Sequence, residues 1–239
     1  MLPELILREE ELLDYKALVG LSLFSGLIGI WIASNFFSSQ ASIVAPLIAA
    51  VPMVFPLMKF YFEEEENPDF VEETSVYGSL FVGLAAAFFI SAIFMPEFFT
   101  TQLETTGLTG EATAQNPTFT GVVTHNLTLF ISILAVSAVL GSAGAFILAL
   151  NASMVGVFFA GLVSDLSGLE IILSNQSPLA YLPHTTLEMT GFMIAGVLGT
   201  TISASVYRQH LSWEHWRQLS KLFVVGFSAV VVGAFIETV

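Results

Sequence analysis

The chain has 239 residues, of which 55% are hydrophobic and only 11% are charged. Soluble domains carry about 25% charged residues, so this composition excludes an ordinary soluble protein and indicates an integral membrane protein. The net charge of −14, from 20 acidic and 6 basic residues, argues against nucleic acid as a partner. There are no cysteines, which excludes disulfides, thiolate catalysis and cysteine metal sites.

Seven hydrophobic segments predict an all-α fold, a polytopic transmembrane helical bundle. They cover residues 17–37, 43–62, 76–95, 125–150, 152–173, 183–206 and 219–237. Most reach the roughly 20 residues that a helix needs to cross a bilayer. The fifth has an apolar run of only about a dozen residues, Ala152 to Val163, before Asp165. It is therefore predicted to be short or broken.

The basic residues predict the orientation of the chain. Two precede the first span, one closes the second, and three lie between the sixth and seventh: Arg8, Lys16, Lys59, Arg208, Arg217 and Lys221. If every segment crosses, all of them lie on one side, which the positive-inside rule assigns to the cytoplasm. We therefore expect a multi-pass protein of the plasma membrane, with the N-terminus inside and the C-terminus outside. The same pattern requires the fifth segment to cross.

Small residues at helix-packing spacing predict close contacts between spans, because they let helix backbones approach one another in lipid. The predicted packing residues are Ser137, Gly141, Ala145, Gly156, Gly161, Ala195 and Gly199. They belong to the fourth, fifth and sixth segments, so we expect these three to form a compact inner bundle.

Polar and ionisable residues gather at the predicted outer ends of the same three segments. A charged group at mid-helix in lipid costs about 2.5–3.5 kcal/mol on insertion scales, so such residues are candidates for a functional site. His184 and Glu188 are spaced i, i+4 and share one helix face. The candidate polar or ion site comprises His184, Glu188, His125, Asn126, Asp165 and Glu170.

Three interpretations of this cluster are open. The residues cap helix ends and cross-link spans by hydrogen bonds, as polar side chains in membrane bundles do. Alternatively they form a proton or cation site, since a histidine can titrate near neutral pH and a glutamate can relay a proton or bind a cation. The third interpretation is a metal-dependent intramembrane hydrolase with His125, His184 and Glu188 as zinc ligands, although no H-E-x-x-H motif is present.

The second half of the chain carries a recognisable pattern. It reads His125-Asn126-Leu127, then a small-residue helix, a glycine-bearing segment, and Leu182-Pro183-His184-x-x-x-Glu188 before an Ala/Gly-rich span. This pattern resembles the stage II sporulation protein M family of polytopic membrane proteins, and most of all its archaeal-type members. The resemblance covers 124–239 well, as a core of four membrane segments. It covers 1–123 loosely, a part with an N-terminal amphipathic helix, three spans and a Thr-rich outer loop.

The resemblance implies a family whose bacterial namesake works in a membrane complex with cell-wall-degrading partners during engulfment of the forespore. It implies no catalytic chemistry. We therefore expect a non-enzymatic scaffold or membrane-remodelling partner without a cofactor. Its partners are the lipid bilayer and other membrane proteins, or itself as a homo-oligomer. The alternative is an ion- or proton-coupled transporter or channel that uses the polar site.

Overall fold

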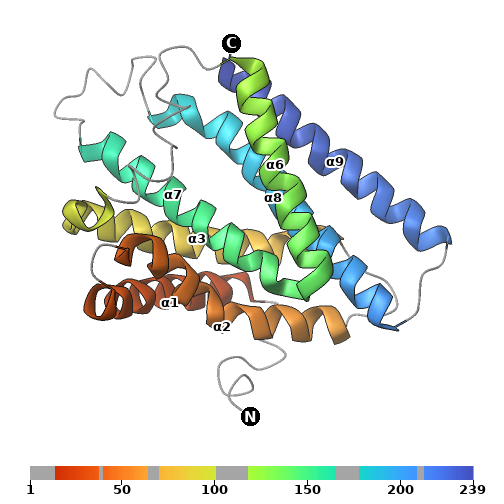
Figure 1. The fold of residues 1–239 in the computed structure, drawn as a ribbon, viewed down its shortest axis with the longest axis horizontal. Helices are drawn as coiled ribbons and strands as arrows, with labels where there is room; N and C mark the ends of the chain where they lie inside the picture. Colours follow the sequence, from red (N-terminus) through yellow and green to blue (C-terminus); the bar gives the residue numbers. More distant parts are fainter. Residues whose placement is uncertain are drawn as a thin grey trace.

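The computed structural model describes residues 14–37, 40–63, 70–100, 118–164, 178–208 and 213–238. Over these ranges the chain forms seven long helices and no strand (Figure 1). The helices are α1 (Tyr15–Phe36), α2 (Ala41–Glu63), α3 (Phe70–Phe94), α6 (Phe119–Leu140), α7 (Gly144–Ser164), α8 (Pro178–Arg208) and α9 (Trp213–Thr238), with short 3-10 turns η3 (Pro96–Phe99) and η4 (Gly141–Ala143). The predicted all-α fold is confirmed. The predicted amphipathic N-terminal helix and most of the Thr-rich loop lie outside the described residues.

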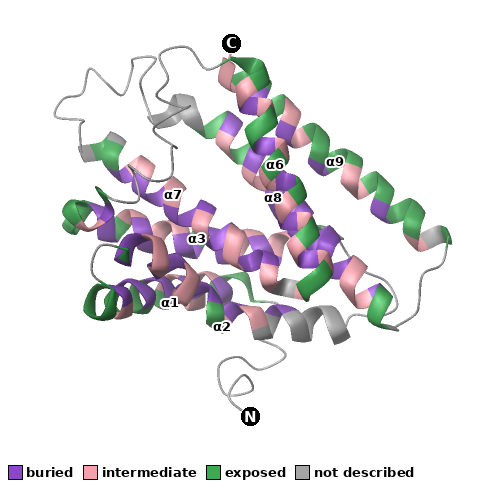
Figure 2. Ribbon diagram, viewed as in Figure 1, coloured by how far each residue is buried: buried purple, intermediate pink, exposed green. Residues whose placement is uncertain are grey.

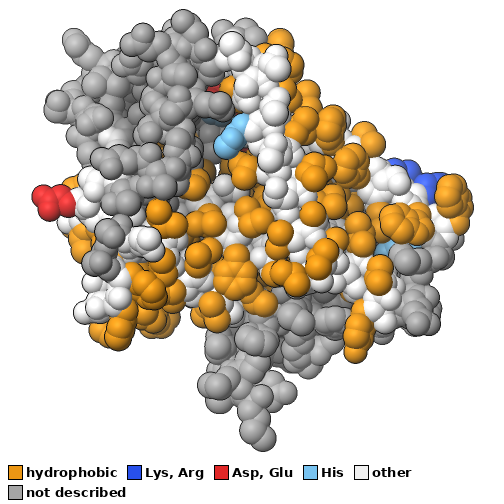
Figure 3. Space-filling view, in the orientation of Figure 1, with side chains coloured by type: hydrophobic (Ala, Val, Ile, Leu, Met, Phe, Trp, Pro, Cys, Tyr) orange, Lys and Arg blue, Asp and Glu red, His pale blue; other side chains and the backbone are white. Residues whose placement is uncertain are grey.

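Most of these helices are built to cross a membrane. Among the described residues, six helices are long and apolar enough to do so: α1, α3, α6, α7, α8 and α9. In α2 the described apolar stretch, Ala41–Val54, is shorter. Hydrophobic side chains also cover much of the visible face of the molecule (Figure 3). The chain is therefore a multi-pass membrane protein, and a polytopic helical bundle is confirmed.

The boundary between the fourth and fifth predicted spans differs from the prediction. α6 ends at Leu140, and Gly141 turns the chain with φ 65° and ψ −130°. Glycine adopts this backbone conformation readily, whereas other residues are strained in it. α7 can therefore begin at Gly144, and it runs unbroken for 21 residues. The prediction that the fifth segment is short or broken was wrong, because the first turns of its helix were assigned to the fourth span.

Contacts between α6 and α8 fix the relative directions of these helices. Asn126 of α6 contacts Glu188 of α8, and farther along Ser137 lies against Gly199. Both pairs are separated by 62 positions, so α6 and α8 run parallel. α7 must therefore return the chain from the end of α6 to the start of α8. The two predicted polar helix starts lie at the same end of the bundle, as the crossing of the fifth segment requires.

The N-terminal helices repeat this arrangement. Ser22 of α1 lies against Gly83 of α3, and Gly26 lies against Ala87, so α1 and α3 also run parallel. α2 must then return the chain between them. The Ser25 hydroxyl donates a 2.8 Å hydrogen bond to the carbonyl oxygen of Ala49 and ties α1 to α2. Each parallel pair is thus joined through an intervening helix, which is the topology expected of successive membrane crossings.

The helices pack in two groups that meet at α8. The first group is α1, α2, α3 and α7, and the second is α6, α8 and α9; α8 also contacts α3 and α7 (Figure 1). The expected compact bundle of the fourth to sixth segments is therefore only partly formed. α6 does pack on α8, but α7 packs mainly on α3.

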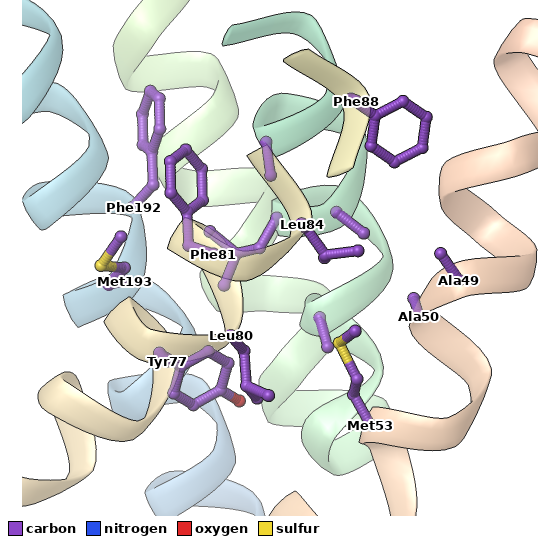
Figure 4. Packing of buried hydrophobic residues seen from close by; sticks show 14 of the residues in the cluster. Ala49, Ala50, Met53, Tyr77, Leu80, Phe81, Leu84, Phe88, Phe192 and Met193 are labelled. Carbon is purple, nitrogen blue, oxygen red and sulfur yellow. The ribbon is translucent and has the colours of Figure 1, made fainter. Parts of the chain in front are cut away.

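α8 is the central helix of the molecule. Every residue from Gly191 to Thr201 is buried (Figure 2). A helix without a polar face suits this position, because it is covered on all sides. The buried side chains of α3, among them Phe81 and Leu84, fill the space between α8 and α2 (Figure 4).

Most of the predicted packing residues lie at helix contacts. A Cβ at Gly199 would meet the Leu134 carbonyl oxygen of α6, and one at Gly156 would meet the Ala85 carbonyl oxygen of α3. The other buried members of the set are Ser137, Ala145 and Ala195.

Two members of the predicted packing set differ. Gly161 is exposed, and no atom of the described residues lies within 4 Å of the position its Cβ would occupy. Gly141 forms the turn between α6 and α7 rather than a helix contact. Spacing alone does not separate these roles, because helix packing and tight turns both select small residues.

Candidate functional site

The candidate site forms at one end of the bundle, where α6, α8 and α9 meet. Asn126 Nδ2 donates a 2.7 Å hydrogen bond to Glu188 Oε1. Both side chains are buried, each with only 7% of its surface exposed. A carboxyl group in an apolar interior is strongly destabilising unless it is hydrogen-bonded. The amide of Asn126 supplies that partner from the neighbouring helix.

His184 shares the face of Glu188 one turn earlier on α8 and is also buried. The start of this helix differs from the prediction. α8 begins at Pro178, so Pro183 lies inside the helix rather than at its first position. Pro183 has no backbone N–H and cannot complete the α-helical hydrogen bond to the carbonyl of Leu179. The polar face therefore starts beside a local break in the backbone hydrogen-bond ladder.

α9 closes the site from the third side, a contribution that the sequence reasoning missed. A Cβ at Gly233 would stand 2.6 Å from Glu188 Cγ and 3.1 Å from the His184 carbonyl oxygen. Glycine at this position therefore lets α9 lie directly on Glu188. One turn later, Glu237 is close enough to Glu188 to interact with it electrostatically. Two neighbouring carboxylates repel each other when both are charged.

A signal for this contribution is present in the sequence. Gly233 lies one turn before Glu237, an acidic residue near the end of the last apolar span. A glycine followed by an acidic residue at i+4 places a gap and a charge on one helix face. Only the packing of α9 on α8 shows that this face meets Glu188.

The structure brings together three of the six predicted site residues: Asn126, His184 and Glu188. His125 is exposed on α6, and Asp165 and Glu170 lie outside the described residues. Within the described part of the chain, no three His, Cys, Asp or Glu side chains are arranged to hold a metal ion. The ligand set proposed for a hydrolase, His125 with His184 and Glu188, is therefore not assembled.

A second polar contact crosses the core away from this site. The Tyr77 hydroxyl of α3 and the Thr200 hydroxyl of α8 lie 3.1 Å apart, and both are buried. Thr200 donates to the Gly196 carbonyl oxygen at 2.9 Å, so Tyr77 is the donor to Thr200. This contact joins the two helix groups, and it shows that hydrogen bonds cross-link buried helices elsewhere in this molecule.

Comparison with known proteins agrees with the helical architecture. Searches of curated proteins and of solved structures give no match. The family model of stage II sporulation protein M matches residues 18–239, which include all the helices from α1 to α9 apart from the first turn of α1. The resemblance found over 124–239 thus extends through the N-terminal spans as well. A match over nearly the whole chain shows that this multi-pass membrane protein belongs to the stage II sporulation protein M family.

Proposed function

We propose that this chain is a non-enzymatic membrane scaffold in which the Asn126–Glu188 contact cross-links helices. The observation that carries this proposal is the buried 2.7 Å hydrogen bond between α6 and α8. Such bonds between membrane helices contribute about 0.6–2 kcal/mol each. Asn126 and Glu188 bond to each other, as expected of residues that link two helices.

A scaffold acts through its outer surface. α6 and α9 expose apolar side chains, among them Val139 on α6 and Val224 and Phe235 on α9. In a membrane this surface contacts lipid or the helices of a partner. We propose that it serves a complex in the plasma membrane, with other membrane proteins or further copies of the chain. The bacterial namesake of the family, which works in such a complex, supports this assignment.

Purification from native membranes in mild detergent tests the scaffold proposal. We expect the chain to co-purify with partners in fixed stoichiometry, or as a homo-oligomer of defined mass. Glu188→Gln should retain these assemblies, because the amide can still accept a hydrogen bond from Asn126. A chain that purifies alone as a monomer, under conditions that preserve other membrane complexes, contradicts the proposal.

A second candidate function, ion or proton transport, is favoured by a specific observation. Glu188 has Asn126 on one side and the carboxylate of Glu237 nearby, with His184 one turn away. Buried ionisable groups on adjoining membrane helices are typical of proton relays and cation pathways. In this alternative Glu188 carries the transported proton or cation.

Flux through proteoliposomes separates the two functions. Proton flux is followed with an enclosed pH-sensitive dye, and sodium and potassium fluxes with isotopes. If the chain transports, Glu188→Gln should abolish the flux, because glutamine holds neither a charge nor a transferable proton. Thr128→Ala, which changes an exposed residue of α6, is the matched control. A flux that survives Glu188→Gln removes this residue from the pathway.

A further inference from the structure

The start of α9 carries aromatic and basic side chains on its outward surface. Trp213 is 84% exposed and Trp216 is 42% exposed, and Arg217 and Lys221 are also exposed. Trp213, Arg217 and Lys221 follow one another at i, i+4 and i+8, so they form a stripe on one helix face. Figure 3 shows basic side chains next to hydrophobic ones at the end of the molecule where α9 begins.

The opposite face of α9 is held against the protein, which fixes the direction of this stripe. His215 Nε2 and the Ser205 hydroxyl oxygen lie 2.8 Å apart and join α9 to the end of α8. Leu219 is buried in the core. Since these two residues face inward, the stripe cannot turn toward the bundle without breaking both contacts.

The stripe lies at the edge of the apolar surface of α9. Val224 and Val225 lie three and four positions after Lys221 and are more than half exposed, as expected of side chains that contact lipid tails. Tryptophan is enriched at the level of lipid headgroups, and long basic side chains extend toward that level. We therefore expect the guanidinium of Arg217 and the ammonium of Lys221 at the level of the headgroup phosphates.

The charge of this segment is opposite to that of the whole protein. The chain has a net charge of −14, whereas residues 213–221 contain two basic residues and one acidic residue, Glu214. The overall negative charge of the protein repels anionic lipids. Attraction of such lipids is therefore confined to local basic segments such as this one. Arginine and lysine N–H groups form charge-assisted hydrogen bonds with phosphate oxygens.

We propose that Trp213, Trp216, Arg217 and Lys221 form a binding site for an anionic phospholipid headgroup. Arg217 and Lys221 donate to the headgroup phosphate, and the two indoles lie at the level of the glycerol backbone. This site is independent of the Asn126–Glu188 contact, which lies at the other end of α9.

Quenching of tryptophan fluorescence by brominated lipids tests the site. The chain is reconstituted in phosphatidylcholine vesicles with Trp31 changed to Phe, so that the fluorescence comes from Trp213 and Trp216. Brominated phosphatidylglycerol should quench more strongly than brominated phosphatidylcholine at equal mole fraction. Equal quenching by the two lipids in this parent protein overturns the proposal without any further variant.

Charge-removing variants identify the residues that bind. Arg217→Gln and Lys221→Gln should each lower the apparent affinity for phosphatidylglycerol about five-fold, as expected for one cation near an anionic surface. Lys16→Gln, an exposed cation on α1, should leave it unchanged. A double variant that keeps the preference, with its helical content intact by circular dichroism, overturns the assignment. Loss of the preference when inorganic phosphate is added instead identifies a soluble ligand and overturns the lipid assignment.

Discussion

Gly233 of α9 lies directly on Glu188 of α8, where a Cβ would stand 2.6 Å from Glu188 Cγ. The added methyl group would displace either α9 or the glutamate side chain from Asn126. We therefore predict that Gly233→Ala lowers the free energy of unfolding by about 1–3 kcal/mol, the usual effect of overpacking. Thermal unfolding in detergent measures this change.

A second glycine substitution provides the control for Gly233→Ala. Gly20 is exposed on α1, and within the described part of the chain no atom lies within 4 Å of its Cβ position. Gly20→Ala should leave stability unchanged or raise it by up to about 1 kcal/mol, because alanine favours the helix. Equal effects of the two substitutions would show that the contact with Glu188 is not tight.

The Asn126–Glu188 hydrogen bond predicts energetic coupling between the two residues. Asn126→Ala leaves the buried carboxyl group without its donor, which should cost about 1–3 kcal/mol. Glu188→Ala removes both the acceptor and the need for a donor. In a double-mutant cycle the double variant should therefore be less destabilised than the sum of the singles, by about 0.5–3 kcal/mol. Additive effects would contradict a direct bond.

The turn at Gly141 predicts a specific requirement for glycine. Alanine is strained at φ 65° and ψ −130°, and such strain costs about 1–3 kcal/mol. Gly141→Ala should thus lower the unfolding temperature in detergent. Gly161→Ala is the matched control, since Gly161 is exposed and its Cβ position meets none of the described residues within 4 Å. If both variants have the same unfolding temperature as the parent protein, Gly141 does not form the turn between α6 and α7 that requires glycine.

The Tyr77–Thr200 contact predicts a smaller effect in the core. Tyr77→Phe removes one hydrogen bond of 3.1 Å but leaves Thr200 bonded to the Gly196 carbonyl. We expect a loss of about 1 kcal/mol, the typical net contribution of one hydrogen bond. Ser75→Ala, whose hydroxyl bonds only to the backbone of its own helix, should change the unfolding temperature less.

The orientation of the chain can be measured because the protein contains no cysteine. Thr124 and Gln218 are exposed near the starts of α6 and α9. If the N-terminus is inside, Thr124→Cys should react with a membrane-impermeant maleimide on intact cells. Gln218→Cys should react only after the cells are permeabilised. The reverse pattern would invert the orientation predicted from the basic residues.

The helices and the pairing of their polar starts could be predicted from the sequence, for a physical reason. A bilayer demands about 20 apolar residues for each crossing, so spans are visible in composition alone. His184 and Glu188 stand out in such spans because ionisable groups are costly there. The parallel order of α6 and α8 then follows from counting crossings.

Other features depend on contacts between distant parts of the chain. The turn at Gly141 lies within one continuous apolar run, so hydropathy does not show that two helices meet there. Gly233 and Glu237 join the site only because α9 packs on α8. The preference of α7 for α3 over α6 is likewise decided by side-chain fit, which local pattern does not contain.

The two α6–α8 contacts share a separation of 62 positions. Sliding α6 along α8 by even one residue would part Asn126 from Glu188 and, at the same moment, drive the backbone near Ser137 into the surface that Gly199 leaves open. The register of α6 on α8 is therefore fixed at two points along the helices. A change of shape that keeps both contacts must therefore move α6 and α8 together as one unit.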